Sequence, residues 1–306
     1  MEITAAQVKE LRDRTSAGMM NCKKALVECD GDIEKAIDWL RQKGLSAAAK
    51  KAGRTTSEGL VGVCVDGTKG TLVEVNAETD FVARNDTFKQ FVSTVAHVAQ
   101  KNDADCEKLL TLDYPETGRN VADELTNMIA TIGENMSLRR VAQLSVNDGA
   151  VVAYVHNKAA DNLGQIGVLV ALESTGDKTK LQEFGKKVAM HIAASNPLSV
   201  NIDDLDPEAV QRERAVVEEQ AKASGKKPEF IGKIVEGRLH KFYEESVLLE
   251  QKYVMDDSLR VKDVVANLEK ELGTNVKISG FVKYKVGEGI EKQVTDFASE
   301  VAAQLG

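Results

Sequence analysis

The sequence predicts an α+β protein, because helical and strand patterns occupy different stretches of the chain. In residues 1–45 apolar residues recur every three or four positions, which indicates amphipathic helices. From residue 58 on, short β-rich runs alternate with helical stretches, and one strand–turn–helix pattern occurs twice. With 306 residues, 42% of them hydrophobic and 29% charged, the chain is long enough for two or three globular domains.

Residues 1–45 predict a three-helix module. Thr4 can cap the first helix, the second begins after Gly18, and the third is expected to end at Gly44. A small bundle of this kind is typical of docking modules, and a purely structural cap is the alternative. Residues 46–57 are rich in Ala and Lys and form a connector.

Residues 58–146 form the first of two predicted α+β units, each with an antiparallel sheet. A β-rich run over 59–65 leads into the hairpin turn signal Asp66-Gly67 and a return strand. Two helices follow, and a strand over 137–144 closes the unit.

Residues 147–199 and 253–286 repeat this order of hairpin, acidic turn and helix, and form the second unit. Phe184 lies 93 residues after Phe91, and the apolar residues that follow match in spacing. Residues 200–252 interrupt the second unit as a charged antiparallel helical hairpin. Its apolar stripe packs either within the chain or against a second copy.

Residues 287–306 predict a C-terminal helix module. Val294 and Phe297 lie on its single apolar face. A helix with such a face docks either on the protein's own core or on a partner.

Composition and motifs argue against several classes of function. Acidic residues outnumber basic ones by 48 to 40, and the net charge of −8 disfavours direct nucleic-acid binding. We find no secretory signal and no membrane-spanning stretch, so we expect a soluble cytoplasmic protein. The cysteines lack metal-ligand spacing, and no nucleotide-binding loop occurs. We therefore expect no cofactor, metal or catalytic residue, and we expect His97 and His191 to be packed and hydrogen-bonded.

The most unusual local feature is the segment 78–86, which reads ETDFVARND between a strand and a helix. In one interpretation Thr79 or Asp80 caps the helix and Phe81 folds back onto the sheet. In the other, Phe81 is an exposed apolar wedge flanked by acidic residues. The residues alone leave both interpretations open.

Several motifs together resemble the bacterial elongation factor Ts family, over essentially the whole chain. The most specific are the segment 8–26 of the N-terminal module and TDFVARN at 79–85. Further matches are IGEN at 132–135 followed by Arg139-Arg140, IGVLV at 166–170, MHIAA at 190–194, VEGR at 235–238 and VGEGIEK at 286–292. There are two departures: Arg84 stands where lysine is common, and residues 156–166 are expected to form a longer loop.

The resemblance implies a guanine-nucleotide exchange factor for elongation factor Tu, with an N-terminal module like a ubiquitin-associated domain. It favours the exposed wedge, and it assigns Thr79, Asp80, Phe81 and Val82 to disturbing the magnesium site of the partner. It also implies that the hairpin can mediate a homodimer. Supporting partner contacts are expected at Arg12, Met19, Met20, Ala83, Arg84, Asn85, Val294 and Phe297.

Two other functions stay open at this point. One is a general interaction adaptor, in which the N-terminal module binds some other ligand. The other is a hydrolase that uses His191 or Ser195, although neither lies in a sequence setting that activates a nucleophile.

Overall fold

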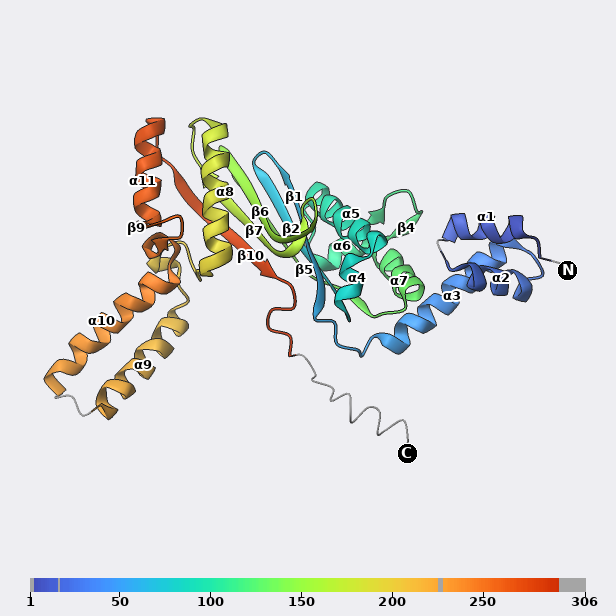
Figure 1. The fold of residues 1–306 in the computed structure, drawn as a ribbon, viewed down its shortest axis with the longest axis horizontal. Helices are drawn as coiled ribbons and strands as arrows, with labels where there is room; N and C mark the ends of the chain where they lie inside the picture. Colours follow the sequence, from blue (N-terminus) through green and yellow to red (C-terminus); the bar gives the residue numbers. More distant parts are fainter. Residues whose placement is uncertain (1–2, 16, 225–227, 292–306) are drawn as a thin grey trace.

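The computed structural model describes residues 3–15, 17–224 and 228–291 and shows a mixed fold of helices and antiparallel strands. An N-terminal helical bundle lies at one end of the molecule, a layered core lies in the middle, and a pair of helices projects from the other end (Figure 1). The predicted residues Val294 and Phe297 lie outside the described residues.

The N-terminal bundle consists of α1 (Ala5–Thr15), α2 (Met19–Glu28) and α3 (Ile33–Lys51). The helix end predicted at Gly44 is wrong, since α3 continues through the first half of the connector. A Cβ atom on Gly44 would lie 3.3 Å from Cβ of Ala130 on the later helix α7. The glycine therefore permits a close helix crossing instead of ending the helix. The core of the bundle contains Val8, Leu11, Cys22, Ala25, Leu26 and Ala36.

The main sheet of the first α+β unit has three strands in the order β1-β2-β5, with helices on one face, and β3 and β4 pair separately. Because β1 and β2 pair from Asp66↔Lys69 onward, the chain turns where the Asp-Gly signal predicts. The elements are β1 (Glu58–Asp66), β2 (Lys69–Ala77), α4 (Asp80–Arg84), α5 (Asp86–Asn102), α6 (Cys106–Thr111), β3 (Asp113–Tyr114), β4 (Arg119–Asn120), α7 (Val121–Ile132) and β5 (Met136–Ser145).

The second unit has the same order of elements, with β7 between β6 and β10. Its helices α8 and α11 cover the sheet on the side away from the first unit (Figure 1). The elements are β6 (Gly149–Ala160), β7 (Leu163–Glu173), α8 (Lys178–Ser195), the short helix η1 (Ile202–Asp204), η2 (Leu248–Glu250), β8 (Lys252–Tyr253), β9 (Asp256–Arg260), α11 (Val261–Leu272) and β10 (Lys277–Lys285).

The segment 156–166 differs from the expected long loop. Strands β6 and β7 extend through it and turn at Asp161-Asn162, because Asn162 adopts the left-handed conformation (φ 59°) that a tight turn needs. The tip of this hairpin pairs with β1 at two positions, Val61↔Gly164 and Gly62↔Leu163. The two expected sheets are consequently joined into one six-stranded network.

The two halves of this network pack face to face around an apolar layer. Gly70 and Gly167 make the close approach possible, since a Cβ atom at either position would lie within 3.0 Å of side chains of the opposite half. Helices α5 and α7 cover the outer face of the first half, and α8 and α11 cover the outer face of the second. The core therefore has four layers, helix–sheet–sheet–helix.

The projecting pair consists of α9 (Pro207–Ala223) and α10 (Pro228–Ser246). A small apolar cluster of Val217, Val235 and Leu239 holds the two helices together. Val216 and Phe230 on the same pair are about half exposed.

Candidate functional site

The most distinctive surface feature is the turn from β2 into α4, which exposes Phe81. The side chain of Phe81 is 74% exposed, whereas Val82 and Ala83 are buried in the core of the first unit. Phe81 thus does not fold back onto the sheet. Val82 and Ala83 were both predicted as partner contacts. They pack in the core of the first unit and are not available on the surface.

Two glutamates hold this turn against the segment that follows α7. The carboxylate of Glu134 accepts hydrogen bonds from the backbone N–H of Thr79 (3.0 Å) and from its hydroxyl (2.8 Å). In the opposite direction, the carboxylate of Glu78 accepts one from the backbone N–H of Asn135. The side-chain amide of Asn135 also donates to the carbonyl oxygen of Arg54 (2.8 Å). The reciprocal bonds place the exposed ring on a fixed support.

The polar neighbours of Phe81 divide into surface and structural groups. Asp80 and Arg84 form an exposed ion pair one helical turn apart (2.8 Å). Asn85 caps α5, because its side-chain oxygen accepts hydrogen bonds from the backbone N–H groups of Thr87 and Phe88. Asp80 and Arg84 are therefore free to face a partner, while the side-chain oxygen of Asn85 is committed to the fold.

The other predicted contacts lie on the N-terminal bundle. Met19 and Met20 begin α2 and are 59% and 76% exposed, and Arg12 on α1 is exposed as well. The bundle and α4 occupy separate parts of the molecule (Figure 1). The structure therefore presents two apolar surfaces, one on the bundle and one on the turn.

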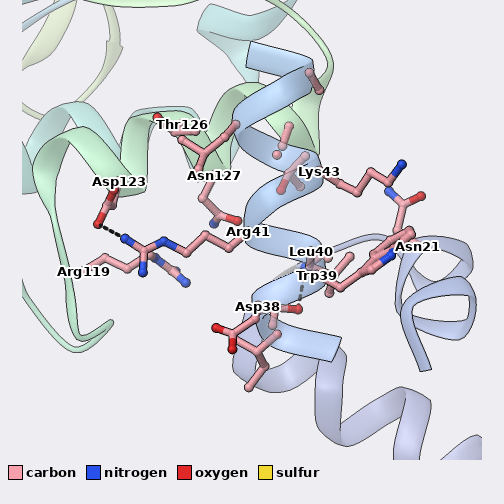
Figure 2. Close-up of a pocket in the computed structure, with 18 of the residues that line it drawn as sticks. Asn21, Asp38, Trp39, Leu40, Arg41, Lys43, Arg119, Asp123, Thr126 and Asn127 are labelled. Carbon is pink, nitrogen blue, oxygen red and sulfur yellow. Dashed lines mark hydrogen bonds and ion pairs between the residues drawn. The ribbon is translucent and has the colours of Figure 1, made fainter. Parts of the chain in front are cut away.

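A cleft of about 590 Å³ lies where the bundle meets the first unit, beside the crossing of α3 and α7. Figure 2 shows Arg41 reaching across it to Asp123, at 3.1 Å. The cleft also holds Arg119, which pairs with Glu124 (2.6 Å), and Trp39, which lies 5.2 Å from the Lys43 ammonium. Arg41 and Arg119 are both already paired with acids, which disfavours an anion-binding site. The arrangement is typical of an interface between two packed parts of one chain.

A buried glutamate, Glu74, forms a second cluster that the sequence reasoning missed. It lies in the middle of β2 with no exposed surface. Arg139 and Arg140 donate to its carboxylate, as does the backbone N–H of Gly287 (2.9 Å). An acidic residue within the apolar run 72–75 was the available signal. The cluster brings together the motifs at 139–140 and 286–292, which are distant in the sequence.

Burial by itself would raise the pKa of Glu74, but the hydrogen bonds from Gly287, Asn76 and Arg140 outweigh it and hold that pKa below its ordinary value. Glu74 is therefore a carboxylate at neutral pH.

The two histidines that the sequence analysis singled out, His97 and His191, lie on different helices, α5 and α8. His191 is fully buried; its Nε2 bonds to the side chain of Gln251 (2.8 Å) and its Nδ1 accepts from the backbone N–H of Val254 (3.2 Å). With both nitrogens engaged, the ring has none left to activate Ser195. His97, expected to be packed, is exposed on α5, with Nδ1 2.7 Å from the carbonyl oxygen of Ser93.

Within residues 3–15, 17–224 and 228–291, no group of three or more His, Cys, Asp or Glu side chains is arranged to hold a metal ion. Across the same residues, no helix is long and apolar enough to span a bilayer.

Comparison with known proteins identifies the family. A family model described as "Elongation factor TS" matches residues 78–288, which is more than half of the chain. Proteins named "Elongation factor Ts" from Paramagnetospirillum magneticum and Rhodospirillum centenum are 59% and 58% identical; each match covers 100% of this chain, and 98% and 99% of those proteins. One from Rhizobium meliloti is 52% identical over 99% of both chains. The resemblance of the motifs is confirmed, and the chain belongs to the elongation factor Ts family.

Proposed function

We propose that the protein is a guanine-nucleotide exchange factor of translation elongation. It binds elongation factor Tu in its GDP-bound and nucleotide-free forms and promotes GDP release, so that GTP can bind. The name shared by its relatives supports the partner. The single observation that carries the mechanism is the exposed Phe81 on its fixed support.

Such a function needs differential binding and no catalytic acid or base. A protein accelerates GDP release only if it binds the nucleotide-free partner more tightly than the GDP-bound one. The coupling is reciprocal, so GDP must weaken the complex by the same factor. The chain therefore needs a wide docking surface and a small element that favours the distorted nucleotide site.

Phe81 is that element in our proposal. Its ring inserts between helices of the partner's GTPase domain, and burying a Phe side chain is worth about 1.5–3 kcal/mol. Asp80 disturbs the magnesium environment indirectly, and Thr79 holds the turn through Glu134. The N-terminal bundle, with Met19 and Met20, and the C-terminal module dock on the GTPase domain. The second unit holds another domain of the partner.

The test is release of labelled GDP from elongation factor Tu. The substitution Phe81→Ala removes most of the buried ring, and we expect the rate at limiting exchange factor to fall about tenfold or more. Leu198→Ala is the control, because it removes an exposed apolar side chain that lies outside the turn, the N-terminal bundle and the projecting hairpin. Full activity of Phe81→Ala, or an equal loss in both variants, would contradict the wedge.

We also propose that the hairpin of α9 and α10 mediates a homodimer. Val216 and Phe230 are exposed apolar residues on an otherwise charged pair of helices, which favours a second copy as the occupant. In light scattering we expect Val216→Glu combined with Phe230→Glu to lower the particle mass from two chains to one. An unchanged mass would exclude the hairpin as the dimer contact.

A further inference from the structure

A single helix, α3, belongs both to the N-terminal bundle and to the first α+β unit. Near its start, Ala36 is part of the apolar core of the bundle. About three turns further along the same helix, Ala48 packs against the core of the first unit. Because one unbroken helix connects the two cores, the direction in which the bundle projects is set by the way α3 lies on the first unit.

Two contacts fix how α3 lies on α7. Gly44 is buried at the crossing, where a Cβ atom on it would lie only 3.3 Å from Cβ of Ala130. About one turn earlier on α3, Arg41 forms an ion pair with Asp123 near the start of α7 (3.1 Å; Figure 2). The two contact points on α7 are separated by about two turns, roughly 10 Å, so together they fix the direction of α3 as well as its position.

Both helices lead into the residues that support Phe81. Shortly after the end of α7, the carboxylate of Glu134 holds Thr79 in the turn. The chain that follows α3 is held by Asn135, whose side-chain amide donates to the carbonyl oxygen of Arg54 (2.8 Å). The packing of α3 on α7 therefore relates the position of the bundle to that of Phe81.

We propose that Gly44 is a positioning residue for nucleotide exchange. The close crossing that it permits holds Met19 and Met20, the exposed pair on the bundle, in a fixed relation to Phe81. Both surfaces then engage one partner molecule without further ordering. This inference rests on the proposed exchange function, in which the bundle and Phe81 contact the same GTPase domain.

A contact that is already in position strengthens a complex because it loses little conformational freedom on binding. If the crossing is opened, the bundle has to be ordered when the partner binds, and the complex becomes weaker. Phe81 still reaches the nucleotide site once the complex has formed. Loss of the crossing therefore raises the concentration of exchange factor that is needed, whereas loss of the Phe81 ring lowers the rate at saturation.

The first experiment measures labelled-GDP release from elongation factor Tu over a range of concentrations of the full chain. Gly44→Leu places a long side chain in the gap towards Ala130, so α3 has to move away from α7. We expect the concentration for half-maximal release to rise about tenfold or more, with the maximal rate unchanged. An unchanged half-maximal concentration, or a lowered maximal rate, would overturn the proposal.

A matched variant separates positioning from a general loss of stability. Gly185 on α8 is also a buried helix glycine, and a Cβ atom there would lie 2.6 Å from Cγ2 of Val152, within the second unit. Gly185→Ala should therefore lower the free energy of unfolding without moving the bundle. Denaturant unfolding gives the folded fraction of each variant, and GDP release is compared at equal folded protein. An equal rise of the half-maximal concentration in both variants would overturn the proposal.

A charge swap tests the direction of α3 while leaving Gly44 in place. Arg41→Asp or Asp123→Arg alone places like charges opposite each other, and each should raise the half-maximal concentration about twofold to fivefold. The double variant restores an opposite pair and should return this concentration to near the wild-type value. A double variant that is no better than the single ones would contradict the proposed role of the crossing.

A last comparison tests whether the effect passes through the surface of the bundle. Met19→Ser combined with Met20→Ser should raise the half-maximal concentration, and in the Gly44→Leu protein it should add less than about twofold, because coupled residues are not additive. Independent, multiplying effects would overturn the proposal. A wild-type protein that leaves GDP release unchanged would overturn the exchange function itself, whereas normal wild-type activity with a silent Gly44→Leu overturns only the role of Gly44.

Discussion

The two α+β units share one order of elements but differ where the central strand meets the first helix. In the first unit, β2 leads into the extra helix α4, which exposes Phe81 and is held by Glu134. In the second unit, β7 leads directly into α8, and Asp177 caps that helix by accepting from the backbone N–H of Lys180 (2.9 Å). The same scaffold therefore carries a surface element in one copy and a plain connection in the other.

The second unit carries its own addition at a different place. The chain between α8 and α11 contains the projecting hairpin, whereas α5 and α7 are separated only by α6 and two short strands. The two units thus differ mainly at their connections, while the layered core stays similar.

The largest expected effect distinguishes the two junctions, which are the turn between β2 and α4 in the first unit and the connection between β7 and α8 in the second. Glu134→Ala removes the carboxylate that accepts both hydrogen bonds from Thr79. Ser174→Ala removes the hydroxyl that donates to the carbonyl oxygen of Asn275 and accepts from the backbone N–H of Gly176 in the second junction. Each change should lower the free energy of unfolding, by about 1–3 kcal/mol at the charged site and about 1 kcal/mol at the neutral one. Only Glu134→Ala should also slow GDP release, because only that junction supports Phe81.

Denaturant unfolding and labelled-GDP release on the same samples check both parts. If Ser174→Ala slowed release as much as Glu134→Ala at equal folded protein, the functional difference between the junctions would be lost.

A smaller difference is expected in how His191 on α8 and His97 on α5 affect the pH dependence of stability. Burial lowers the pKa of His191, and the bond to Gln251 offsets this only in part. The folded protein therefore holds His191 neutral at a pH where the unfolded chain already binds a proton. Above the unfolded value of about 6.5 the ring is neutral in both states, and as the pH falls below it the protein loses stability, by at most about 1.4 kcal/mol per pH unit.

Unfolding free energies at pH 7.5 and 5.5 measure this effect. His191→Gln should flatten the difference between the two values, and His97→Gln, at an exposed position on α5, should leave it as in the wild type. A wild-type profile in the His191→Gln protein would assign the pH dependence to another group.

Local patterns in the sequence were sufficient for most of the elements. The period of apolar residues predicts α1 to α3, and the Asp66-Gly67 signal predicts the first hairpin, because these depend on neighbours a few residues away. The segment 78–86 was identifiable for the same reason, as a large apolar residue among polar ones. The sequence could not choose between an exposed and a packed Phe81 without the family resemblance.

Contacts between distant residues had no local signal. Gly44 looked like a helix end, but its partner is Ala130 on another helix. Val82 and Ala83 looked like part of a surface motif, but the core of the first unit buries them.

The sequence by itself determined the class of fold, the repeated unit, the acidic character and the family, because each is encoded in local periodicity, composition or a short motif. Tertiary structure alone decided which of these residues act together. Glu74 meets Gly287 across 213 residues, and the tip of the β6–β7 hairpin joins the two sheets at Val61 and Gly62. Such contacts arise only when the layers pack, since packing alone brings distant backbone groups within hydrogen-bond distance.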